Sequence, residues 1–147
     1  MAVQDELLLT CRAVVHQHQC DFMGHMNVSH YVSRFDEATW QLVGRLGLTR
    51  DYCLERGVGM AAVQQNISYL RELRAGDIFT IYSGVHEVRQ RLLHFEHLLL
   101  RDDDDETAAR CDMRIVHMDA TGRRATPLPA FVAGRAEALM WPASLAD

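Results

Sequence analysis

The pattern of hydrophobic and polar residues changes its period early in the chain. From Leu7 to His18 apolar and polar side chains roughly alternate among β-prone residues, which predicts a strand. From Val28 to Leu46 the apolar residues recur at helical spacing, which predicts one long amphipathic helix. Asn27 is a suitable N-cap for this helix, and Gly47 is a suitable stop. The segment between strand and helix, residues 20–27, fits neither period and predicts a loop.

The rest of the chain is predicted to be mostly β-structure. A linking segment, Leu48–Gly57, is followed by four predicted strands: Met60–Leu70, Ile78–Val88, Leu92–Arg101 and Thr107–Met118. A short helix is expected at Ala130–Met140. Consecutive strands joined by short turns favour an antiparallel meander, and one long helix is the natural cover for its apolar face. We therefore predict a single α+β domain over residues 1–147, in which a curled antiparallel sheet wraps around a central helix.

Composition narrows the possible functions. The 147 residues are 48% hydrophobic and carry a net charge of −5, which fits one globular domain and gives no reason to expect a nucleic-acid partner. All 15 basic residues are arginine, so Schiff-base, P-loop and Ser–Lys chemistries are excluded. The four cysteines are far apart and no apolar run reaches membrane length, which predicts a cytoplasmic protein with reduced thiols and no membrane partner.

The loop before the long helix carries the most specific chemistry. Asp21 precedes the predicted N-cap by six residues on a glycine-containing loop, so its carboxylate can fold back toward the helix start. A helix N-terminus presents unpaired backbone N–H groups and a positive potential, which can stabilise a developing oxyanion. A carboxylate beside such a group of donors is the minimum equipment for hydrolysing an acyl group.

The motif D-x-x-G-H-M-N-x-x-x-Y, followed downstream by I-x-Y-L-R-E-L-R-A-G-D, resembles the hotdog-fold acyl-CoA thioesterases of the 4-hydroxybenzoyl-CoA thioesterase type, in the subgroup with G-H-M-N. This resemblance implies a hotdog fold and a homodimer, often paired into a tetramer, with active sites at the dimer interface. It implies an acyl-CoA substrate and no cofactor beyond the CoA of that substrate. It further implies that Asp21 acts as general base or nucleophile, while the helix N-terminus polarises the thioester carbonyl through residues His25, Met26, Asn27 and Val28.

Other residues are assigned to the substrate. Gly24, Tyr31 and Tyr69 are candidates for contacts with the acyl group, although either tyrosine could instead belong to the core or to an interface. Arg71 and Arg74 are candidates for the CoA phosphates, because guanidinium groups match phosphate geometry. The segment from Arg34 to Thr39 also resembles thioesterases for betaine-like acyl groups.

Several alternatives remain at this point. Asp21 could be a turn former that accepts backbone hydrogen bonds, and Asn27 could serve only as an N-cap. His16, His18, Cys20 and His25 suggest a metal site, but the separated second pair of a structural zinc site is missing, so no metal is predicted. A hotdog dehydratase is disfavoured because no proline occurs before Pro127, whereas a non-catalytic acyl-thioester-binding module remains the main alternative to a hydrolase.

Overall fold

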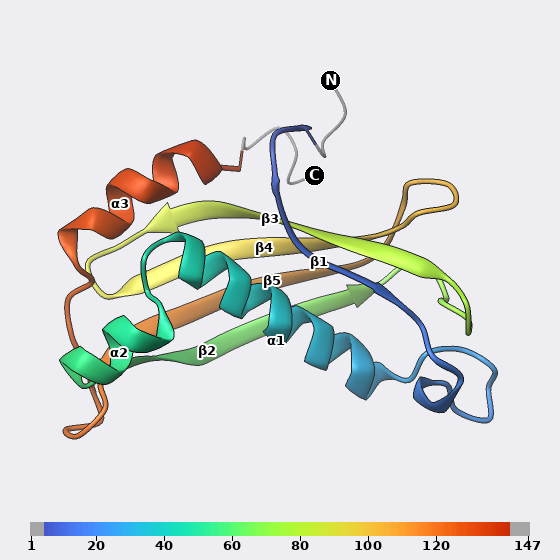
Figure 1. Cartoon of the computed structure of the whole chain (residues 1–147), viewed down its shortest axis with the longest axis horizontal. Coiled ribbons are helices and arrows are strands. Elements are labelled where there is room, and N and C mark those ends of the chain that lie inside the picture. Colours follow the sequence, from blue (N-terminus) through green and yellow to red (C-terminus); the bar gives the residue numbers. More distant parts are fainter. Residues whose placement is uncertain (1–4, 142–147) are drawn as a thin grey trace.

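The computed structural model describes residues 5–141 as one curled sheet with a long helix lying across its concave face (Figure 1). The helices are α1 (Val28–Arg45), α2 (Arg50–Arg56) and α3 (Ala130–Ala136), with short 3₁₀ turns at Gln17–Gln19 and Glu137–Leu139. The strands are β1 (Leu8–Val14), β2 (Val58–Tyr69), β3 (Ile78–Val88), β4 (Leu92–Arg101), β5 (Glu106–Asp119) and β6 (Arg124–Ala125). The α+β class predicted from the periodicity is confirmed.

The strand order is β1-β3-β4-β5-β2, every pairing is antiparallel, and the short β6 pairs with β5. Strands β3, β4 and β5 form the predicted meander. The expectation that β2 starts this meander is wrong, because β2 pairs with β5 and the chain then crosses to β3 on the other side of the sheet. As a result β1 and β2 lie at opposite edges of the sheet, with α1 between them.

The core forms between α1 and the concave face of the sheet. The helix contributes one apolar stripe, which consists of Tyr31, Phe35, Ala38, Leu42 and Val43. Strand β5 alternates as predicted, with buried residues at Ala109, Cys111, Met113 and Ile115. Burial of this stripe fixes the position of the helix, so its N-terminus is held at a defined place at one end of the sheet.

Three local predictions differ from the structure in their bounds or detail. The first strand ends at Val14, and residues 17–19 form a 3₁₀ turn because the Gln19 side chain accepts a hydrogen bond from the backbone of His16. His16 and His18 therefore do not share a strand face. The linking segment contains α2, which is capped by Thr49 and ends at Gly57 in the left-handed region, with φ of 64°. The last α-helix stops at Ala136 and continues as a 3₁₀ turn.

Among residues 5–141, no helix is long and apolar enough to cross a membrane.

Candidate active site

The predicted loop folds back on itself immediately before α1. Cys20 and Met26 form an isolated antiparallel bridge, and Gly24 closes the turn between them with φ of 86°. The Met26 N–H donates to the Leu73 carbonyl at 2.7 Å, and the Asn27 N–H donates to the Gln19 carbonyl at 2.9 Å. These backbone bonds attach both ends of the loop to neighbouring segments, so the position of Asp21 relative to the helix start is fixed.

The Asp21 carboxylate lies at the N-terminus of α1. Its Oδ2 accepts a hydrogen bond from the Asn27 side-chain amide at 2.9 Å, and its Oδ1 accepts one from the Met23 backbone N–H at 2.9 Å. The amide of Asn27 and the backbone N–H of Met23 hold the pKa of Asp21 below its ordinary value. The side chain is therefore ionised throughout the neutral pH range.

Asn27 links this carboxylate to the helix. Its Oδ1 accepts hydrogen bonds from the Ser29 backbone N–H at 3.0 Å and from the Ser29 hydroxyl at 2.9 Å, which makes it the N-cap of α1. The capping role predicted for Asn27 is confirmed. The Met26 and Asn27 N–H groups, which were predicted to polarise the carbonyl, are already bonded to Leu73 and Gln19. The His30 N–H donates to the Asn27 carbonyl at 3.0 Å. This leaves the Val28 N–H as the first-turn donor without an acceptor among residues 5–141.

A pocket beside this loop gathers most of the predicted substrate residues. It is lined by His25, Met26, Val28, Tyr31, Tyr69, Leu70, Arg71 and Glu72. Tyr31 is buried and packs edge-on against the half-exposed ring of Tyr69, with 5.2 Å between ring centroids. Burial raises the pKa of Tyr31 to about 12, so this phenol remains neutral and acts as a hydrogen-bonding group.

Both predicted phosphate-binding arginines are exposed at the end of β2. Arg71 Nε donates to Glu106 at 2.8 Å, and Arg74 lies 3.8 Å from Glu72. Glu72 also lies 3.8 Å from the His25 ring, so this glutamate connects Arg74 to the loop. A further pocket is lined by Leu70, Arg71, Glu72, Arg74, Asp77 and Arg101. Exposed ion pairs of this kind are weak and can be exchanged for a phosphate partner.

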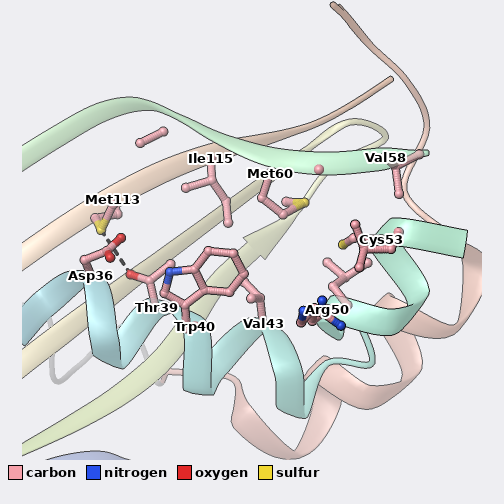
Figure 2. Close-up of a pocket in the computed structure, with 14 residues that line it drawn as sticks. Asp36, Thr39, Trp40, Val43, Arg50, Cys53, Val58, Met60, Met113 and Ile115 are labelled. Carbon is pink, nitrogen blue, oxygen red and sulfur yellow. Dashed lines mark hydrogen bonds between the residues drawn. The ribbon is translucent and has the colours of Figure 1, made fainter. Parts of the chain in front are cut away.

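A third cavity lies farther along α1 and is lined in part by Asp36 and Thr39, from the segment that resembles thioesterases for betaine-like acyl groups (Figure 2). It has a volume of about 300 Å³ and is largely apolar, with walls that include Val43, Leu48, Cys53, Leu54, Met60, Met113 and Ile115. Figure 2 shows Asp36 and Trp40 on the same side of α1, directed toward the strands that carry Met60 and Ile115. The spacing of four residues between Asp36 and Trp40 explains why they lie together.

Trp40 is the signal that could have located this cavity from the sequence. It falls outside the apolar stripe of the helix and remains 62% exposed despite its large indole ring. A large aromatic side chain that the core does not use is a candidate for a ligand or an interface contact.

The structure thus brings the predicted residues into one region around the N-terminus of α1. Asp21 and Asn27 are bonded directly, and Gly24 shapes the turn between them. Their catalytic and substrate-binding roles stay predictions, because position alone does not establish them.

The fold and the site together define a hotdog-type thioesterase domain, and the comparisons agree. The profile of the thioesterase-like superfamily matches residues 15–136, so the chain belongs to this superfamily. The chain is 30% identical over 111 residues, 74% of its length, to the "L-carnitine dehydrogenase/betainyl-CoA thioesterase" of Agrobacterium fabrum. It spans only 22% of that relative. It is also 23% identical to the "Betainyl-CoA thioesterase" of Pseudomonas aeruginosa, over 91% of this chain and 84% of the relative.

A solved structure supports the same architecture. Protein SAV2348 of Staphylococcus aureus, determined in complex with CoA, superposes with a TM-score of 0.84 and covers 96% of this chain and 94% of its own. At 19% sequence identity this likeness concerns the fold. The predicted hotdog architecture and the resemblance to thioesterases are confirmed, and the predicted enzyme class, a thioester hydrolase, is that of the named relatives.

Proposed function

We propose that this protein hydrolyses an acyl-CoA thioester to a free acid and CoA, with Asp21 as the reacting carboxylate. The observation that carries the proposal is the hydrogen bond from Asn27 to Asp21, which places an ionised carboxylate at the start of α1. Membership of the thioesterase-like superfamily supplies the reaction class. In this proposal the thioester carbonyl lies between Asp21 and the start of α1, where the Val28 N–H and the positive end of the helix stabilise its oxygen as negative charge develops.

Two routes use this arrangement. Asp21 removes a proton from a water molecule that attacks the carbonyl carbon, or Asp21 attacks that carbon itself and forms an anhydride that water then hydrolyses. In both routes the carbon–sulfur bond breaks, and CoA leaves as a thiolate that takes up a proton. A single turnover in oxygen-18 water separates the routes, because only the anhydride route can transfer the label to the Asp21 carboxylate.

The proposal includes a homodimer, which can pair into a tetramer. Strand β2 runs from Val58, beside the apolar cavity, to Tyr69, beside the loop pocket, and lies at the edge of the described sheet. A two-fold axis that pairs two β2 edges makes them antiparallel. The Tyr69 end of one copy then lies next to the Val58 end of its partner. Asp21 of each copy thereby faces the apolar cavity of the other, which completes an acyl-binding site.

The lining of this cavity favours an acyl group with a quaternary ammonium head. An indole face and a carboxylate, here Trp40 and Asp36, are the groups that recognise a trimethylammonium cation. The names of the two relatives specify betainyl-CoA, whose acyl group carries that cation. We therefore include betaine-like acyl-CoA thioesters in the proposal as the preferred substrate class.

The test is a thiol-release assay on a panel of acyl-CoA thioesters that contains betainyl-CoA and tert-butylacetyl-CoA. These two substrates have the same shape and differ only in the charge of the head group. A cation–aromatic contact is worth about 0.5–2 kcal/mol, so kcat/KM should favour betainyl-CoA by about 2- to 30-fold. The variants Trp40→Leu and Asp36→Asn should reduce this ratio. Equal rates for both substrates would contradict the head-group assignment alone. Saturable binding without thiol release from any substrate would instead indicate a non-catalytic binding module.

A further inference from the structure

The convex face of the sheet, opposite α1, carries a cluster of titratable side chains that thioester hydrolysis does not use. Along β4, Leu93 and Phe95 point into the core, so the alternating residues His94 and Glu96 point to the convex face. His86 on β3 and Asp112 on β5 join them there, and these four residues line one pocket with Glu87. Three neighbouring strands therefore contribute to one polar site.

Strand geometry aims the two histidines at each other. The register between β3 and β4 shifts between Val85 and Glu87, so His86 is the extra residue of a β-bulge. Bulges redirect a side chain relative to the regular alternation. The His86 and His94 rings are 4.8 Å apart between centroids. The Trp141 ring also packs against His86, with 5.5 Å between ring centroids.

Glu96 and Asp112 contact the His86 and His94 rings in the same way. Glu96 accepts from His86 Nε2 at 2.9 Å with Oε2, and its other oxygen contacts Arg110 at 2.9 Å. Asp112 accepts from His94 Nε2 at 2.8 Å with Oδ2, and its other oxygen contacts Arg114 at 3.1 Å. Each carboxylate thus uses one oxygen for an arginine and turns the other toward an imidazole.

We propose that His86, His94 and Asp112 bind a divalent transition-metal ion, with zinc as the best fit, on the convex face of the sheet. One ligand atom from each residue lies within 4.8 Å of the other two. Zinc bonds of about 2.0–2.2 Å place tetrahedral ligand atoms about 3.3 Å apart. The widest separation between the ligand atoms, 4.8 Å, must therefore shorten by about 1.5 Å through side-chain rotations. Two imidazoles and one carboxylate select zinc and its neighbours, whereas calcium and magnesium prefer oxygen ligands.

The surrounding groups are suited to a bound ion. On binding, each coordinating nitrogen gives up its hydrogen bond to a carboxylate, and the imidazole keeps its proton on the other nitrogen. Arg114 stays on the second oxygen of Asp112, and Glu96 keeps its contact with Arg110. A fourth position open to the pocket takes water. The ion then connects β3, β4 and β5, and stabilises the fold by an amount that grows with the logarithm of the free zinc concentration above the Kd.

Zinc titration of the chelator-treated protein, followed by calorimetry, tests the proposal. We expect one zinc ion per chain, and a Kd at least about tenfold weaker in His94→Gln and in Asp112→Asn. The matched control is the double variant His16→Gln/His18→Gln, which removes another pair of adjacent histidines whose rings stack at 5.5 Å. This control should bind zinc like the unmodified protein. The His94 and Asp112 variants should keep their circular dichroism spectrum and their thioesterase rate, because the cluster lies away from Asp21.

X-ray absorption on the zinc-loaded protein identifies the donor atoms. Nitrogen and oxygen at about 2.0–2.2 Å are expected, whereas sulfur at about 2.3 Å would assign the ion to a cysteine and overturn the proposal. It would also be overturned if micromolar zinc did not bind, or if His94→Gln bound zinc as tightly as the unmodified protein while the His16/His18 variant did not.

Discussion

At the scale of single residues, Asp21 and Asn27 act as one unit. Asp21 shows the hydrogen bond to the Met23 N–H that is expected of a turn former, and it also faces the helix start. The two interpretations of this residue that the sequence left open are therefore compatible in structure. They differ in what a substitution does to turnover and to stability.

Asp21→Asn tests the catalytic role, because it removes the negative charge at almost constant size. We expect kcat to fall at least about 100-fold, the lower end of general-base effects, with little change in KM. A small loss of stability is also expected, since the new amide opposes the Asn27 amide. Steady-state kinetics and thermal unfolding measure the two effects separately.

The exchange variant Asp21→Asn/Asn27→Asp is the matched control. It restores an amide–carboxylate hydrogen bond between positions 21 and 27, and aspartate is as good an N-cap as asparagine. Stability should recover while turnover remains low, because the carboxylate has moved. Recovery of both properties would show that Asp21 only fixes the loop.

His97 is the residue with the strongest pH signature. It is fully buried, its ring packs against Phe35 and Phe95, and it contacts the hydroxyls of Ser83 and Thr39. Burial lowers the pKa of His97 to about 3, from 6.5 for the exposed group. The unfolded chain therefore binds a proton below about pH 6.5 that the folded protein does not bind.

The stability linked to His97 is fully present above about pH 6.5 and is lost as the pH falls toward 3. In this range it should lower the free energy of unfolding by about 1.4 kcal/mol per pH unit. The other titrating groups are the same in His97→Phe, so the difference between the two proteins isolates this slope. Denaturant unfolding at a series of pH values measures it, and parallel curves for both proteins would show that His97 does not contribute.

At the scale of elements, the sequence predicted those features that depend on residues close together in the chain. Helix α1 was predicted at Val28 and is found there, because an N-cap and a continuous apolar stripe are both encoded within the segment. Helix α2 was missed since its seven residues are too few to establish a period. The partner of β2 was also missed, because alternation fixes which face of a strand is buried but not which strand it pairs with.

The candidate site was likewise predictable only where its residues lie close together in the sequence. The loop from Asp21 to Asn27 is compact in sequence, so its motif located it. The cavity lined by Trp40 and Met60 combines residues from α1, α2, β2 and β5, and only the fold brings these together. The convex-face cluster is hidden in the same way, because His86, His94 and Asp112 belong to three strands.

The segment after β2 carries a prediction about CoA. Arg71 and Arg74 are exposed and their ion pairs are with the surface carboxylates Glu106 and Glu72, so they can bind phosphate groups. Arg71→Ala/Arg74→Ala should raise KM for acyl-CoA several-fold and change kcat little, because these contacts are equal in the ground and transition states. The control substrate is the matching acyl-pantetheine, which lacks the nucleotide phosphates. Its KM should not change, and an equal rise for both substrates would assign these arginines to the loop structure.

At the scale of the whole molecule, the two edges of the sheet differ. Each edge strand has one register shift, between Leu9 and Cys11 in β1 and between Ala62 and Gln64 in β2. Strand β1 has seven residues, whereas β2 has 12 and leaves its outer edge without a partner among residues 5–141. Exposed apolar side chains surround this edge, namely Val28, Val32, Trp40, Leu54, Val63, Tyr69 and Leu70. A long open edge beside apolar surface is suited to pairing with a second copy.

Val63 lies near the middle of β2 and is 57% exposed, so two-fold pairing of these edges brings the two Val63 side chains close together. Val63→Glu would place two carboxylates there, and like charges facing each other in an interface cost several kcal/mol. We expect a dimer for the unmodified protein and a monomer for this variant by light scattering at micromolar concentration. Thioesterase activity should fall with the dimer, because each Asp21 then loses the cavity of the other copy.

Leu9→Glu, at the opposite edge, should leave both mass and activity unchanged. Mixing Val63→Glu with Val63→Arg should restore a dimer and its activity, which a folding defect could not do. A monomeric mass for the unmodified, active protein would contradict the composite site.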